Sequence, residues 1–266
     1  MMDKLIDIKN SLNDRILTNI TFNENSFEMK LNDIVFLYND GRNWKVIPLK
    51  VTQMYPIIYD LYYENENAIP ITIYVCPYTL FSCIYFEEML SYDKVYNNNL
   101  VLMNKKNNDM IIIPILNNIY SVSTQTLQEK YIRKNEIKAM TIRNAISLYP
   151  DSQFINMKDI KPKASLVDNT YLSDNTIMFD IEKPPLFTNH HPKTLIYIVE
   201  YKSKTTHKYK YTVVIPKKNT FDRVKNGMHK YLDVMNLKIT EKGGIIYSCL
   251  WFAWICTFPS SRIIKL

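Results

Sequence analysis

The chain has 266 residues, a formal net charge of +7, 47% hydrophobic residues and 22% charged residues. These values are typical of a globular protein and exclude extensive disorder, and the length suits one large domain or two small ones. Only four glycines occur, which nearly excludes a Rossmann or P-loop nucleotide site, because both need glycine-rich loops. Most of the positive charge is lysine, as AT-rich coding produces, so binding of nucleic acid is unlikely although not excluded.

Residues 1–32 are interpreted as an N-terminal helix and a lead-in. Apolar residues recur there at helical spacing, at Leu5, Ile8, Leu12 and Ile16. Acidic residues in the same segment argue against a membrane-surface anchor, so we expect this helix to pack on the body of the protein. No continuous apolar stretch of a secretory signal is present, which favours an intracellular protein with reduced cysteines.

Residues 33–158 are predicted to form a β-rich unit. It opens with a hairpin over Asp33–Pro48, where Asp40-Gly41 suits the positive φ angles of a tight turn. Apolar and β-branched runs between Asn-rich turns predict further strands at Ile57–Tyr63, Ile69–Val75, Phe81–Phe86, Leu100–Met103, Met110–Ile115 and Ile119–Val122. Helical spacing of apolar residues predicts a helix over Glu136–Tyr149.

Residues 159–188 are interpreted as an irregular surface connector, because they are rich in Pro, Asp, Asn and Ser. Residues 189–266 are predicted to form a second unit in the same globule, with a hairpin over Leu195–Ile215 and a helix over Asp222–Leu237. The apolar run Ile245–Phe258 then predicts one or two buried strands. It is shorter than the roughly 20 residues that a helix needs to cross a bilayer, so no transmembrane segment is expected, and a membrane-dipping segment is the minor alternative.

The opening pattern returns in the second unit. Residues 213–218, Val-Val-Ile-Pro-Lys-Lys, echo residues 45–50, Lys-Val-Ile-Pro-Leu-Lys, and Cys256 lies near the end of an apolar run as Cys76 does. Two diverged copies of one hairpin–helix–hairpin unit explain this, and chance similarity in an Ile- and Lys-rich sequence is the alternative. The predicted fold class is therefore α+β, made mainly of antiparallel hairpins with a few packed helices and a possible internal duplication.

Four motifs between about residues 33 and 154 occur in the order found in one protein family. They are residues 40–49 (DGRNWKVIPL), 69–79 (IPITIYVCPYT), 96–103 (YNNNLVLM) and 149–154 (YPDSQF). The chain thus resembles a widespread, mostly prokaryotic domain family of unknown function, whose members read AYPL, VTYCPLTGSA, NNNLVMYD and YPDT at these places. The family's HEIVND segment is replaced by residues 55–60 (YPIIYD), and most family glycines are absent. If the family has an active site, this chain has lost part of it.

Cys76 is the best candidate for chemistry, with Thr79 and Ser82 nearby. It follows a strand at a Pro-containing turn, where side chains are often presented at a sheet rim. A nucleophilic cysteine needs a base or cation close by, and the four histidines are all distant in sequence, so a buried packing cysteine is the more frequent explanation. The C-x6-C spacing of Cys76–Cys83 and Cys249–Cys256 is not typical of zinc sites, and no metal or cofactor is expected.

Two functions stay open. The first is a non-catalytic binding or assembly module with an unknown protein partner, for instance a cytoplasmic or virion-associated structural or accessory protein of a virus. The second is a Cys76-dependent enzyme of unknown reaction. Lysine and tyrosine alternate through residues 201–211, which is more typical of a hairpin with one solvated face than of a single-strand nucleic-acid site.

Overall fold

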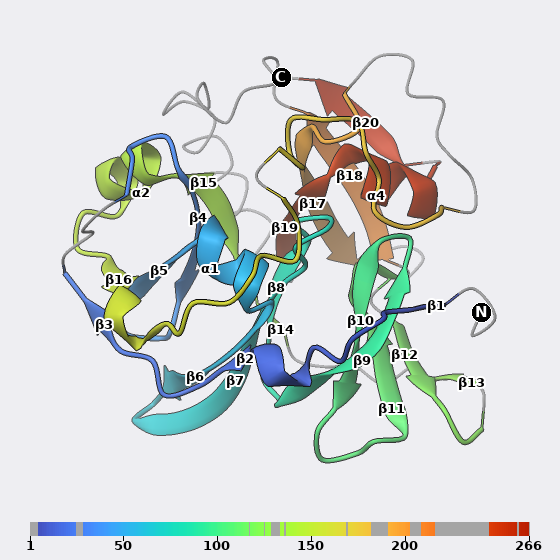
Figure 1. Cartoon of the computed structure of the whole chain (residues 1–266), viewed down its shortest axis with the longest axis horizontal. Coiled ribbons are helices and arrows are strands. Elements are labelled where there is room, and N and C mark those ends of the chain that lie inside the picture. Colours follow the sequence, from blue (N-terminus) through green and yellow to red (C-terminus); the bar gives the residue numbers. More distant parts are fainter. Residues whose placement is uncertain are drawn as a thin grey trace.

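The structure is a computed structural model of the whole chain. It describes residues 5–24, 29–116, 118–124, 126–128, 134–135, 137–168, 170–181, 191–202, 209–215, 245–259 and 261–265. These residues form a β-rich fold of four mainly antiparallel sheets with a few short helices (Figure 1). No helix within these ranges combines the length and the apolar character that a membrane crossing requires.

Sheets 1 and 2 contain the middle of the chain. Sheet 1 has the order β1-β9-β10-β11-β12-β13, with the bounds β1 Ile6–Asp7, β9 Met89–Tyr96, β10 Asn99–Asn104, β11 Met110–Ile113, β12 Asn118–Ser121 and β13 Thr126–Gln128. Sheet 2 has the order β14-β8-β7-β6-β2, with the bounds β2 Ile16–Leu17, β6 Ile57–Glu64, β7 Asn67–Val75, β8 Ser82–Tyr85 and β14 Lys134–Asn135. The predicted β6–β7 hairpin is confirmed, with Asn65 and Glu66 at positive φ in its turn.

Sheets 3 and 4 are built around the two predicted hairpins. Sheet 3 has the order β15-β4-β5-β16-β3, with the bounds β3 Phe22–Asn23, β4 Ile34–Asn39, β5 Trp44–Pro48, β15 Lys138–Thr141 and β16 Gln153–Ile155. Sheet 4 has the order β19-β17-β18-β20, with the bounds β17 Leu195–Lys202, β18 Tyr209–Ile215, β19 Ile245–Leu250 and β20 Arg262–Lys265. Both hairpins are confirmed.

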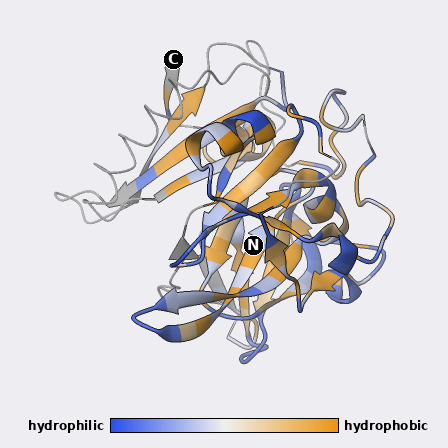
Figure 2. Cartoon of the chain, turned by 90° about the vertical axis from the view of Figure 1, so that its left-hand side faces the viewer, coloured by the Kyte–Doolittle hydropathy of each residue, from blue (hydrophilic) through white to orange (hydrophobic). Residues whose placement is uncertain are grey.

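Short helices link these strands. The α-helices are α1 Leu49–Met54, α2 Ile142–Leu148 and α4 Trp251–Thr257, and the 3-10 turns are η2 Asn13–Arg15, η3 Pro114–Leu116 and η4 Met157–Asp159. Figure 1 shows sheet 3 beneath α2 on one side of the molecule, sheet 4 with α4 on the other, and β7 and β8 between them. Hydrophobic residues lie mainly along the strands and α4, and hydrophilic residues in the connecting loops (Figure 2).

Sheet 3 is buried on both faces, which explains its strongly apolar strands. In β4, Val35 and Leu37 belong to a small core under α2, whereas Phe36 and Tyr38 belong to the main core. This is the two-residue alternation of a strand with an apolar layer on each side. At the hairpin turn Gly41 has φ +94°, and a Cβ there would lie 2.0 Å from the Tyr63 carbonyl oxygen, so only glycine fits.

Sheets 3 and 4 have the same order over four strands. In each, a strand pairs antiparallel with the first hairpin strand, a short helix follows, and the next strand pairs parallel with the second hairpin strand. The last residue before each helix pairs with the first hairpin residue, as Thr141 does with Ile34 and Leu250 with Leu195. Aromatic-Pro follows both helices, at residues 149–150 and 258–259.

Several predicted elements differ from those observed. The described part of the segment predicted as an N-terminal helix contains β1, η2 and β2 instead, because Ile6 and Ile16 each join the edge of a sheet. The helix predicted over Glu136–Tyr149 begins only at Ile142, because Lys138–Thr141 pairs with β4. The apolar run Ile245–Phe258 is β19 followed by α4, not strands alone.

The expected likeness between Cys76 and Cys256 also fails. Cys76 follows a strand, whereas Cys256 lies within α4, the counterpart of α2. The helix predicted over Asp222–Leu237 lies outside the described residues. Within the predicted connector, the described residues 160–168 and 170–181 contain no helix or strand.

Sheets 3 and 4 differ in the hydrogen bonding of two serines at equivalent positions. This difference can be tested by substitution. Ser261, four residues after the end of α4, accepts a hydrogen bond from Trp254 Nε1 at 3.0 Å and donates to the Phe258 carbonyl at 2.9 Å. Its counterpart Ser152 follows α2, where Ala145 replaces the tryptophan, and within the described residues its buried hydroxyl has no partner.

We expect Ser261→Ala to lower the free energy of unfolding by about 1–2 kcal/mol, because it leaves a buried indole N–H unpaired. Ser152→Ala should be neutral or stabilising, because it removes a buried hydroxyl that lacks a partner. Urea denaturation of both variants measures the difference. Equal losses for the two serines would contradict this assignment.

Candidate functional site

The Cys76 turn is a closed loop between β7 and β8. The Cys76 N–H donates to the Phe81 carbonyl at 2.9 Å, and the Leu80 N–H donates back to the Cys76 carbonyl at 2.8 Å. Pro77 cannot continue the strand ladder, and Leu80 closes the loop at φ +55°. Ser82 then opens β8, opposite Val75.

The structure brings Cys76, Thr79 and Ser82 into this one turn, but it directs their side chains to different partners. The Cys76 thiol donates to the Asn98 carbonyl at 3.4 Å, and the Thr79 hydroxyl donates to Asn99 Oδ1 at 2.7 Å. The Ser82 hydroxyl lies 3.4 Å from that of Ser248. All three turn residues are 0% exposed. The turn thus uses its polar groups to contact the β9–β10 turn of sheet 1 and strand β19 of sheet 4.

The irregular connector covers this turn from outside. The Tyr171 hydroxyl donates to the Tyr78 carbonyl at 2.9 Å, and the rings of Tyr78 and Phe179 meet edge to face at 5.1 Å. Asn98 donates to the Phe179 carbonyl and accepts from the Phe179 N–H, both at 2.8 Å, as a neighbouring strand would. Cys76 therefore lies inside the core, as the packing-cysteine alternative expected, and not at an open sheet rim.

The surroundings of Cys76 are neutral phenols and thiols. Burial raises the pKa of Tyr74 well above its ordinary value, and the nearby Cys76 raises it further. Burial and then Cys76 have the same effect on the pKa of the Cys249 thiol. A nucleophilic thiolate needs a cation or base beside it, and Tyr74 and Cys249, whose raised pKa values keep them neutral, supply neither. The arrangement is suited to packing and hydrogen bonding.

His191, the one histidine among the described residues, bonds to its own segment. His191 Nδ1 accepts from the Lys193 backbone N–H at 3.2 Å, and the remaining histidines lie outside the described residues. All four cysteines are free thiols, and burial raises the pKa of the half-buried Cys256 to about 12. In the described ranges no three His, Cys, Asp or Glu side chains lie together as metal ligands would.

A buried charge cluster joins sheets 3 and 2, and the sequence analysis did not find it. Lys45 Nζ lies 2.7 Å from Asp60 Oδ2 and 2.9 Å from Asp40 Oδ2. The Tyr38 hydroxyl donates to the same Asp60 oxygen at 2.5 Å. The two backbone N–H groups of residues 42 and 43 donate to Asp40 Oδ1 and hold the turn. The sequence did carry a signal for this cluster, because a lysine and an aspartate lie within strands that are otherwise apolar.

The cluster keeps Lys45 charged. Burial alone disfavours the ammonium, but hydrogen bonds to Asp60 and Asp40 outweigh burial, so the pKa of Lys45 is raised. Burial, and then the Asp60 carboxylate, raise the pKa of Tyr38 well above its usual value. The tyrosine therefore acts as a neutral donor, and the cluster is a structural ion pair between two sheets.

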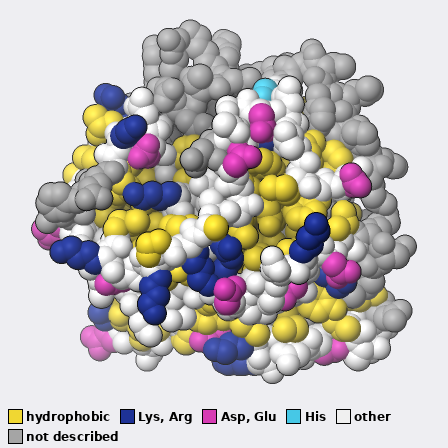
Figure 3. Space-filling model, viewed as in Figure 1, with side chains coloured by type: hydrophobic (Ala, Val, Ile, Leu, Met, Phe, Trp, Pro, Cys, Tyr) yellow, Lys and Arg dark blue, Asp and Glu magenta, His cyan; other side chains and the backbone are white. Residues whose placement is uncertain are grey.

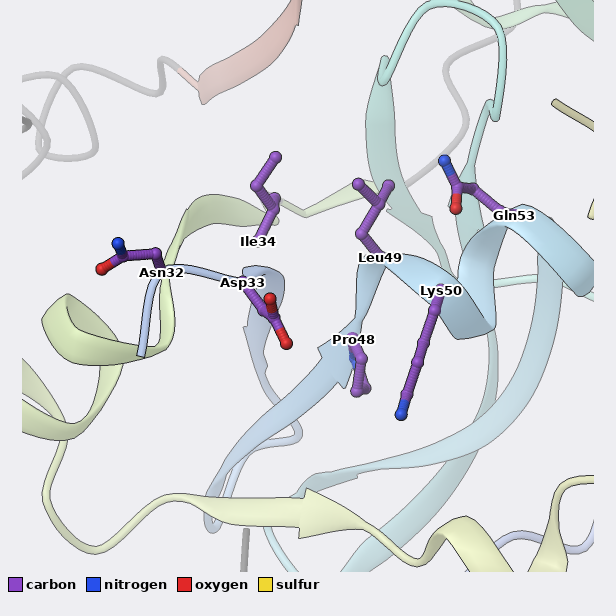
Figure 4. A pocket seen from close by; sticks show the side chains of 7 residues that line it. All are labelled: Asn32, Asp33, Ile34, Pro48, Leu49, Lys50 and Gln53. Atoms are coloured by element: carbon purple, nitrogen blue, oxygen red, sulfur yellow. The ribbon is translucent and has the colours of Figure 1, made fainter. Parts of the chain in front are cut away.

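An open pocket lies on the outer side of sheet 3, between the start of β4 and helix α1. It has a volume of about 370 Å³, and its lining consists of Asn32, Asp33, Ile34, Pro48, Leu49, Lys50 and Gln53. Figure 4 shows Ile34 and Leu49 on one side of the pocket and the Asp33 and Lys50 side chains on the other. This combination of an apolar wall with a few polar groups is suited to binding a small group or a short segment.

Comparison with known proteins gives no match: no protein-family model, no curated protein and no solved structure matches this chain. The motif resemblance described above therefore stays a prediction.

The charge cluster generates a stability prediction. Asp60→Asn should lower the free energy of unfolding by about 2–3 kcal/mol at pH 7, because it weakens charge-assisted bonds to buried Lys45 and Tyr38. Glu88→Gln is the matched control, since Glu88 pairs with Lys105 at 3.1 Å in a partly exposed position and should cost under about 1 kcal/mol.

The difference in the free energy of unfolding between wild type and Asp60→Asn should also depend on pH. Because the pKa of Lys45 is raised on folding, its contribution is fully present below the unfolded pKa of about 10.4 and is lost as pH rises through the folded value. Urea melts of wild type and Asp60→Asn should therefore differ by a constant amount from pH 7 to 9 and converge in more alkaline solution. A difference that grows with alkaline pH would contradict the ion-pair account.

Proposed function

We propose that this protein is a non-catalytic binding or assembly module that acts on a protein partner. The observation that carries the proposal is the position of Cys76, Thr79 and Ser82, which are fully buried and bonded to two other parts of the fold, the β9–β10 turn and strand β19. A catalytic group must reach its substrate, whereas these groups reach only neighbouring sheets. The proposal extends to an intracellular setting, such as that of a viral structural or accessory protein.

The proposal includes the family resemblance. Three of its four motifs lie at junctions: residues 40–49 contain two members of the charge cluster, residues 69–79 lead into the Cys76 turn, and residues 96–103 contain the asparagines that bond this turn. Motifs that stabilise a fold survive when a catalytic site is lost. We therefore interpret the chain as a divergent member of that family which keeps the scaffold.

The proposal also includes an internal duplication, with sheets 3 and 4 as its two copies. The strand order, the pairing registers and the aromatic-Pro step after each helix support it. So do two backbone bonds at each helix start. Ile142 and Arg143 donate to the carbonyls of Asp33 and Leu31, as Trp251 and Phe252 donate to those of Thr194 and Pro192.

Thiol reactivity tests the non-catalytic assignment. In native protein at pH 7.5 we expect N-ethylmaleimide to modify half-buried Cys256 at least about tenfold faster than Cys76, because Cys76 reacts only after an opening of the core. Peptide mapping by mass spectrometry gives the rate at each cysteine, and labelling in guanidinium checks that all four can react. If Cys76 is the first to be modified, the Cys76-dependent enzyme becomes the better explanation.

A further inference from the structure

One wall of the pocket beside α1 has a counterpart in sheet 4 that the chain itself covers. The helix-start hydrogen bonds make Asn32 and Asp33 the counterparts of Lys193 and Thr194. Lys193 and Thr194 are almost fully buried, whereas Asn32 is exposed and Asp33 is half-buried. The same position, one wall of the pocket, is therefore covered in one sheet and open in the other.

The segment that covers the sheet 4 position is acidic and aromatic. Lys193 Nζ bonds to the Tyr171 carbonyl and lies 2.6 Å from Asp174 Oδ1. The same ammonium lies 3.4 Å from the centre of the Tyr171 ring. Asp168 adds a further negative charge near Lys193. A lysine at this place is thus satisfied by a carboxylate and an aromatic ring from one short segment.

The open pocket has complementary chemistry for a similar segment. Lys50 is exposed and lines it, while the Asp33 carboxylate is already accepting from the Lys30 N–H at 2.9 Å. Two of the large hydrophobic side chains that remain exposed flank this region: Leu31, 50% exposed, precedes Asn32, and Ile146, 41% exposed, lies on α2, whose first turn is bonded to residues 31 and 33.

Figure 3 shows the face that includes this region, where exposed hydrophobic side chains lie among Lys, Arg, Asp and Glu side chains. On such a surface an exposed lysine attracts an acidic group by charge, and the apolar side chains beside it retain a partner by contact.

We propose that the pocket between β4 and α1 binds a short acidic segment of a partner protein that inserts an aromatic side chain between Ile34 and Leu49 and places a carboxylate against Lys50. This inference rests on the proposed function, because it names the partner chemistry of a binding module. The chain's own residues 168–174 are an example of a sequence that we expect to fit this pocket.

A peptide titration tests this binding site. The probe is a fluorescent synthetic peptide with the sequence of residues 167–175, titrated with full-length protein and followed by fluorescence anisotropy. In the native protein the chain's own copy of this segment already occupies sheet 4, so the free peptide should bind at the open pocket. Replacing both aspartates of the peptide by asparagine should weaken binding about threefold to tenfold.

Matched variants locate the site. Lys50→Glu should weaken binding about threefold to tenfold, whereas Lys106→Glu, the same charge change in the exposed β10–β11 turn, should not. Leu31→Ser should weaken binding, and Leu61→Ser, at an exposed leucine of the β6–β7 hairpin, should not.

Absence of binding, or equal effects of the Lys50 and Lys106 variants, would overturn this inference. Neither result would touch the proposed function, which depends on the reactivity of Cys76 in the separate labelling experiment.

Discussion

The fold depends on one constraint: the turn from Cys76 to Ser82 carries polar groups that are buried where sheets meet. Buried polar groups cost free energy unless they are hydrogen-bonded, so each must find a partner in another part of the chain. Thr79 is the clearest case, because its hydroxyl bonds to Asn99 while its carbonyl accepts from the Leu250 N–H at 2.7 Å. One residue of sheet 2 thereby fixes both sheet 1 and sheet 4. The connector then closes the junction through Tyr171. The turn that the sequence suggested as a site of chemistry thus serves to connect sheet 2 to sheets 1 and 4.

The charge cluster around Lys45 has the same role for sheet 3. A buried ion pair is a weak source of net stability, but it is specific, because only one arrangement satisfies all its members. Lys45 is satisfied only when the β4–β5 hairpin lies against β6, which supplies Asp60. The two polar junctions thus fix how the sheets are placed, while apolar packing supplies most of the stability. This division leaves the outer surfaces, including the pocket beside α1, free for binding.

Much of the strand pattern was predictable, because hairpins are local. The apolar runs on either side of Asp40-Gly41, and the strands on either side of the Asn65-Glu66 turn, are each joined by a tight turn that specifies their pairing. Strand β9 was missed, because it is polar at its centre and Asp93 adopts φ +56° beside an irregular register with β10. The run Ile245–Phe258 has no hydrophobic periodicity that distinguishes a strand from a helix. A segment buried on all sides is apolar in either case. The candidate turn was located correctly from Cys76-Pro77. A buried packing cysteine was the favoured explanation of Cys76, but the segment that covers the turn was not predictable, because Tyr171 is distant in sequence. The ion pair was not predictable either, because charged residues are normally assigned to the surface.

The most direct test of this account is native-state hydrogen exchange at the Cys76 turn. The N–H groups of Cys76, Leu80 and Leu250 hold the turn and dock it on β19. If the turn is a structural junction, these three amides exchange only through global unfolding, with the same free energy and the same denaturant dependence as the slowest amides of β7. Exchange of the three through a smaller opening, while β7 and β19 stay protected, would mean that the turn opens to solvent in the folded protein. That result would contradict the account and would make Cys76 accessible to a substrate.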